Sequence, residues 1–215
     1  MRTRFTLLLL ALSVILRAQS TKLPADVDPY SYSRLPLVQP DQLDASGQRV
    51  YDFLNGKDQD TPRIGPTAAV LYSPDVGEPF EKFNGAERKT VAGTRYFEIC
   101  TLIAAREFDQ RYVWSAHELS AQRAGLERRV IDAIKFNRGV EDLADKDAAL
   151  IRFGRDLFRQ HMVSSTLYAQ VVESFGRRGM VELAVILGEY AMTAVVLNAV
   201  DRQLPPGRKA LLPEK

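Results

Sequence analysis

"RYFEICTLIAAREFDQRYVWSAHELSAQRAGLERRVIDAI" (residues 95–134) contains three successive helix patterns. Its first part is strongly apolar, and its middle part ends in Gly125, a residue suited to a helix C-cap. Its last part sets Val130, Ile131 and Ile134 against charged residues, which is the pattern of an amphipathic helix. Since no alternating strand pattern competes with this spacing, the stretch predicts an all-α fold.

Helical patterns continue on both sides of this stretch. Further helices are expected over residues 41–55, 68–83 (as a short pair), 145–160, 164–176 and 180–201. The last of these is the most apolar, but it contains Glu182, Glu189 and Asn198. We therefore interpret it as a core helix and not as a membrane span.

The first twenty residues have the features of a signal peptide. Arg2 and Arg4 precede an apolar run over residues 5–16, and small residues follow at Ala18 and Ser20. The alternative is an uncleaved membrane anchor, which would be the only link to a membrane. This segment predicts an exported protein, periplasmic or secreted.

Charge and composition limit the classes of partner. The segment 1–20 carries three arginines and no acidic residue, so its removal lowers the formal net charge from +2 to −1. No strongly basic face is then expected, and nothing favours nucleic acid as a partner. The remaining chain divides into an arm and helix (21–66, with four prolines over 21–40), a helical domain (67–203) and a C-terminal tail (204–215).

Two polar residues stand in apolar surroundings. Glu98 is the only charged residue between Tyr96 and Ala105, and a buried carboxylate must be paired, protonated or facing a cavity. It suits proton transfer, but a plain ion pair with Arg95 or Arg106 would also explain it.

His117 points the same way as the apolar Val113 and Trp114. It suits proton transfer as well, or it is a hydrogen-bonded core residue. No spacing of histidines or cysteines typical of a metal site occurs, so no metal and no other cofactor are expected. The single cysteine, Cys100, is either a small buried hydrophobic residue or a reactive thiol, and it cannot form a disulfide within the chain.

Three segments together resemble one known family. The stretch 95–134, "LYSPDVGEPFEKF" (71–83) and "GEYAMTAVVLNAV" (188–200) are similar to the carboxymuconolactone decarboxylase-like family, which includes alkyl hydroperoxidase D (AhpD). The resemblance covers about residues 68–203. It implies an AhpD-like multi-helix bundle that assembles as a homo-oligomer, a trimer or a hexamer.

The resemblance also implies a site. The family glutamate and histidine fall on Glu98 and His117, whereas the two cysteines of the redox branch fall on Gln110 and Val113. Dithiol peroxide chemistry needs both thiols, so peroxiredoxin or alkyl hydroperoxidase activity is an alternative that these residues do not favour. The branch without cysteines implies acid–base chemistry of the decarboxylase (lyase) type on a small carboxylated lactone.

Six residues are expected to contact that small-molecule substrate. Arg106 and Arg111 would hold its carboxylate, and four further side chains would line the cavity: Tyr112, Trp114, Tyr190 and Asn198. Core packing of Tyr112 and Trp114 and an interhelical hydrogen bond of Asn198 are the alternatives. A helical binding protein without catalysis is the remaining functional alternative.

Overall fold

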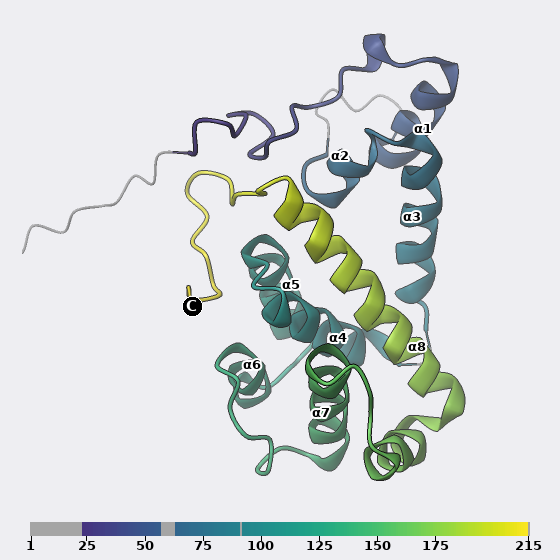
Figure 1. Cartoon of the computed structure of the whole chain (residues 1–215), viewed down its shortest axis with the longest axis vertical. Coiled ribbons are helices and arrows are strands. Elements are labelled where there is room, and N and C mark those ends of the chain that lie inside the picture. Colours follow the sequence, from purple (N-terminus) through teal and green to yellow (C-terminus); the bar gives the residue numbers. More distant parts are fainter. Residues whose placement is uncertain (1–22, 57–62, 91, 215) are drawn as a thin grey trace, which may run out of the picture.

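The computed structural model describes residues 23–56, 63–90 and 92–214, and over them the fold is all-α, as predicted (Figure 1). The described residues form no strand, and Asp28 and Ser33 share one isolated β-bridge. The elements are η1 (Pro40–Gln42), α1 (Ala45–Asn55), α2 (Pro66–Val70), α3 (Pro74–Glu87), α4 (Gly93–Glu107), α5 (Arg111–Arg123), α6 (Arg128–Lys135), α7 (Asp145–Arg159) and α8 (Ser165–Ala199).

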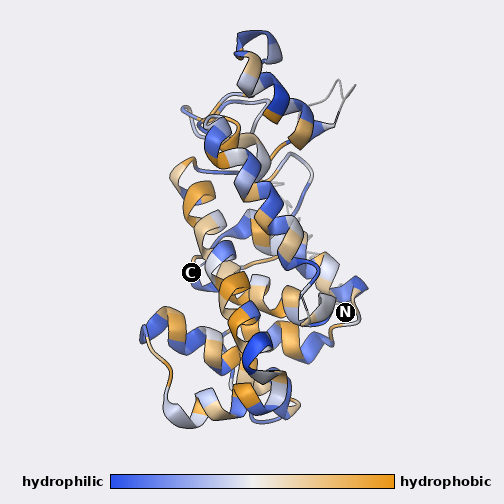
Figure 2. Ribbon diagram, turned by 90° about the vertical axis from the view of Figure 1, so that its right-hand side faces the viewer, coloured by the Kyte–Doolittle hydropathy of each residue, from blue (hydrophilic) through white to orange (hydrophobic). Residues whose placement is uncertain are grey.

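Helix α4 is the centre of the bundle. It contacts α5, α6, α7 and α8, and its Ile99, Leu102 and Ile103 are fully buried. Burial of each such side chain contributes roughly 1.5–3 kcal/mol, so α4 holds the surrounding helices together. Figure 2 shows that hydrophobic and hydrophilic residues alternate along most of the helices.

Helix α8 combines the two helices expected over residues 164–176 and 180–201. The side chain of Ser164 caps its start by accepting a hydrogen bond from the Leu167 N–H (3.2 Å). At Gly176 the backbone leaves the helical conformation (φ 70°, ψ 169°), a region that glycine adopts at little cost. The second part then runs past α4.

By length and composition, α8 is the one helix of the described segments that could cross a membrane. The core helix of a bundle meets the same criteria, and the buried Leu183, Ile186 and Leu187 lie in the central core. After Gly176, four large aliphatic side chains of α8 stay exposed: Val181, Val185, Met192 and Val195. Assembly into a trimer or hexamer remains a prediction.

The helices α1, α2 and α3 form a smaller layer beside α8. They share an apolar cluster that includes Val50, Leu54, Leu71 and Phe80, and both α2 and α3 contact α8 (Figure 1). This layer covers the part of α8 on which the site described below is built.

The arm and the tail meet at the end of α8. The Arg34 N–H donates to the Val200 carbonyl (2.7 Å), and the Gln203 N–H donates to the Tyr32 carbonyl (2.8 Å). The described tail, 204–214, contains no helix. The predicted signal peptide (1–20) lies outside the described residues, and the division at 66/67 and 203/204 stays a prediction.

Candidate active site

Glu98 of α4 and His117 of α5 face each other across the helix pair. His117 Nδ1 lies 2.8 Å from Glu98 Oε2, and the two side chains are 16% and 4% exposed. The alternative ion pairs of Glu98 do not form, because Arg95 binds Glu127 and Asp147 instead (2.7 and 2.6 Å). Arg106 pairs with Asp109. The expected convergence of the two side chains is therefore confirmed, while their catalytic role remains a prediction.

A cavity of about 230 Å³ opens beside His117. The Tyr190 ring meets the imidazole edge to face, with 5.1 Å between the ring centroids. Helices α2, α3, α5 and α8, together with the segment before α2, supply its lining: Arg63, Pro66, Thr67, Phe80, Glu81, Asn84, Arg88, Tyr112, Val113, Ala116, His117, Glu189, Tyr190 and Thr193. The cavity thus combines aromatic walls with polar and charged side chains, including two arginines and two glutamates.

The cations of this cavity are not the expected ones. Arg88, just after α3, donates from Nη2 to the Tyr190 hydroxyl (3.2 Å) and from Nε to Asn84 Oδ1 (3.2 Å). Its guanidinium also lies over the Phe97 ring, 4.8 Å from the centroid. Arg63 is the second cation and lies 3.8 Å from Glu81. Sequence reasoning missed both, because their place depends on how the α2–α3 layer packs on α8.

Two buried acids lie near the cavity. Glu189 lines it, with Oε1 accepting from Thr193 Oγ1 (3.0 Å), while Oε2 has no hydrogen-bond partner in the described part of the chain. Burial raises the pKa of Glu189. Burial, helped by the charge of Glu189, also raises the pKa of Glu87 to about 8. Near neutral pH, Glu87 therefore keeps its proton.

Tyr112 and Tyr190 line the cavity as expected, but Trp114 does not. Trp114 is fully buried, and its Nε1–H donates to Glu118 Oε2 (2.5 Å). Glu118 in turn binds Lys135 Nζ (2.7 Å). Trp114 is thus part of the core, which was the alternative to substrate contact, and Lys135 of α6 lies over its ring (5.7 Å from Nζ to the centroid).

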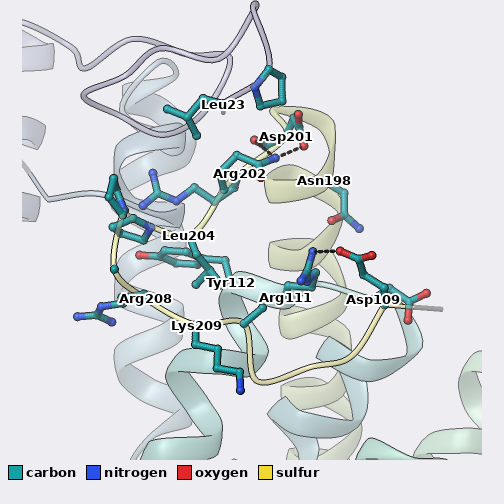
Figure 3. Close-up of a pocket in the computed structure, with 17 residues that line it drawn as sticks. Leu23, Asp109, Arg111, Tyr112, Asn198, Asp201, Arg202, Leu204, Arg208 and Lys209 are labelled. Atoms are coloured by element: carbon teal, nitrogen blue, oxygen red, sulfur yellow. Dashed lines mark hydrogen bonds and ion pairs between the residues drawn. The ribbon is translucent and has the colours of Figure 1, made fainter. Parts of the chain in front are cut away.

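The other three expected contacts also lie away from His117. Arg106 points to Asp109 and lines neither cavity. Arg111 and Asn198 line a different, larger cavity near the tail (Figure 3). Asn198 accepts from Gln110 Nε2 (2.8 Å) and donates to the Phe108 carbonyl (3.0 Å), so it forms the interhelical hydrogen bonds considered above.

Comparison with known proteins identifies the architecture. No known protein family and no curated protein matches the sequence, but solved structures match the fold. One is the alkylhydroperoxidase AhpD core, an uncharacterised peroxidase-related protein from Ralstonia eutropha JMP134 (TM-score 0.60, 16% identity, covering 82% of this chain and 93% of that chain). The chain has the AhpD-like fold. Another is the debrominase Bmp8, solved as a cysteine-to-alanine variant with 2,3,4-tribromopyrrole (TM-score 0.58, 16% identity, covering 81% of this chain and 94% of that chain).

In this AhpD-like fold the two positions expected for cysteines hold other residues. Gln110 caps α5, accepting from the Tyr112 N–H (2.8 Å), and Val113 lines the cavity. Cys100 is fully buried, and burial raises its pKa well above the usual range of a thiol. It lies 3.8 Å from the Leu183 carbonyl. The described residues hold no group of three potential metal ligands.

Cys100→Ser is expected to leave peroxide consumption unchanged and close to the uncatalysed rate. A thiol with a raised pKa is protonated at neutral pH and is a poor nucleophile. The measurement is consumption of hydrogen peroxide and of an organic hydroperoxide with dithiothreitol as reductant. Fast turnover by the unmodified protein that disappears in Cys100→Ser would contradict this expectation.

Proposed function

We propose that this chain is an acid–base enzyme that acts on a small carboxylated molecule, with chemistry of the decarboxylase or lactone type. The observation that carries the proposal is the 2.8 Å contact between His117 Nδ1 and Glu98 Oε2 at the wall of a cavity. A buried carboxylate fixes the orientation of an imidazole and stabilises its protonated form. The pair needs neither of the cysteines that peroxide reduction requires.

Each group has a distinct role in this proposal. Because Nδ1 of His117 is held by Glu98, the other ring nitrogen, Nε2, is the one that exchanges a proton with a substrate in the cavity. When the bond between the substrate and its carboxylate breaks, carbon dioxide leaves and the electron pair stays on the substrate carbon. His117 then supplies the proton that this carbon takes up. Glu189, whose pKa is raised by burial, would in its protonated form donate a hydrogen bond to the carbonyl oxygen on which charge develops.

The size and charge of the cavity support a small acidic substrate. A volume of about 230 Å³ fits a single ring with few substituents. The 2,3,4-tribromopyrrole in the Bmp8 structure is a molecule of that size. Arg88 supplies the positive charge for a carboxylate, since guanidinium groups bind carboxylates with two parallel hydrogen bonds.

The proposal is tested by a turnover screen. The full chain is incubated with a panel of small carboxylated lactones and unsaturated keto acids, and release of carbon dioxide and loss of the substrate are measured. Stabilisation by these compounds with no turnover of any of them would identify the alternative, a binding protein without catalysis.

Arg88→Gln is expected to raise KM for such a substrate by about tenfold or more, with a smaller effect on kcat. The reason is that Arg88 is proposed to hold the carboxylate and not to move the proton. Arg177→Gln, a change at an exposed arginine that does not line the cavity, is the matched control. Equal KM values in the two variants would remove Arg88 from the proposal.

Residues 1–20 bear on the cellular location of the proposed enzyme. We propose export from the cytoplasm on the strength of their charged start and apolar run. Mass spectrometry of the mature N-terminus from the producing cell tests this step, because cleavage after residue 18 to 20 would remove all three leading arginines.

A further inference from the structure

The larger cavity lies on the other side of Tyr112. It has a volume of about 740 Å³ and is enclosed by the start of α5, the end of α8, arm residues 23–24 and the tail. Figure 3 shows the tail curving around it with Leu204, Arg208 and Lys209, while Arg202 and Tyr112 lie inside the curve. The proposed function makes no use of this space.

Arg202 is a buried cation that lines this cavity without a counter-ion. The residue is 7% exposed, and Nη1 donates to the Ser31 carbonyl. Its guanidinium stacks on the Tyr112 ring at 4.4 Å, whereas Nε and Nη2 have no hydrogen-bond partner in the segments described. No carboxylate of those segments lies within ion-pair distance of it, and burial lowers its pKa accordingly. A buried charge in this condition costs stability unless something neutralises it.

The acids around the cavity are occupied by other groups. Glu214 binds Arg111 (2.8 Å), and Asp201 lies 4.0 Å from Arg34 Nη2 and also accepts from Gln203 Nε2 (2.6 Å). Asp109 pairs with Arg106. By contrast, Arg208 and Lys209 form no ion pair with any residue that the structure describes. The charge left without a counter-ion is therefore positive.

We propose that this cavity binds a small organic anion through a carboxylate or phosphate group placed against Arg202, with Arg208 and Lys209 of the tail closing over it. Guanidinium nitrogens suit these two groups because their planar donors match paired oxygens. A stacked aromatic ring holds the guanidinium in place beforehand, so little order is lost on binding. This site is independent of the Glu98–His117 pair, and neither proposal requires the other.

Thermal unfolding and calorimetry of the full chain test the site. Inorganic phosphate and malonate are titrated separately, with chloride keeping the ionic strength constant. We expect at least one of the two anions to raise Tm by about 3 °C or more at saturation. The shift should be lost in Arg202→Met and kept in Arg177→Met, which removes an exposed arginine instead.

Two further measurements keep the test decisive. Without added anion, Arg202→Met should be at least as stable as the unmodified chain, because methionine fills the site without a charge. If Arg202→Met fails to fold, the double change Arg208→Gln and Lys209→Gln replaces it and should weaken the measured affinity several-fold. No shift with either anion in the unmodified chain, or an equal shift in the Arg202 and Arg177 variants, would overturn the proposal.

Discussion

Replacing His117 with alanine should lower kcat for a substrate found in the turnover screen by about a hundredfold or more. Positioned proton transfer contributes on the order of 10²–10⁴ to a rate, and His117 is the one imidazole at the cavity. Glu98→Gln should cost at least about tenfold, because an amide cannot stabilise the protonated ring that the carboxylate faces at 2.8 Å. Steady-state kinetics at several pH values measure both effects.

The control for this prediction is the second histidine of the chain. His161 is exposed just after α7 and adopts a positive φ of 60°, a conformation that asparagine tolerates well. His161→Asn should therefore keep full activity. Circular dichroism of all three variants checks that they are folded. Turnover that persists in the double variant of Glu98 and His117 would show that the chemistry lies elsewhere.

Glu87→Gln is expected to stabilise the protein at high pH, by roughly 2 kcal/mol or more at pH 9. The pKa of Glu87 rises from 4.5 in the unfolded chain to about 8 in the fold. Between pH 4.5 and about pH 8, Glu87 is therefore protonated in the folded state and ionised in the unfolded state. Its free energy of unfolding must fall as the pH rises from about 4.5 to about 8. Glutamine does not ionise, so the Glu87→Gln variant does not lose this part of its free energy of unfolding.

Urea unfolding at several values between pH 5 and pH 9 measures the effect. The stability difference between Glu87→Gln and the unmodified chain should be near zero at pH 5 and grow with pH. The nearby Glu189 shifts in the same direction and keeps part of the slope in the variant. Glu173→Gln, at an exposed carboxylate, is the control and should run parallel to the unmodified chain. If the free energy of unfolding of Glu87→Gln ran parallel to that of the unmodified chain over this pH range, the pKa of Glu87 would not be raised in the fold.

Local features of the sequence were enough to predict the helices, and the family resemblance was needed to pair Glu98 with His117. Apolar spacing placed the helices, and Ser164 and Gly176 marked a start and a break that the structure reproduces. Glu98 and His117 could be matched because the helices that carry them are neighbours in the chain, joined by a short turn. Helix periodicity then limits which side chains can face each other.

Only the tertiary structure decided what surrounds that pair. Tyr190 and Asn198 share one helix, but eight residues separate them by about 12 Å, so they line two different cavities. Arg88 and Glu189 meet at the site because α3 packs on α8 across a hundred residues of chain. Such contacts depend on long-range packing, which local spacing does not contain. For the same reason the sequence alone pointed to Arg106 and Arg111, whose partners are instead Asp109, three residues along the chain, and Glu214 of the tail.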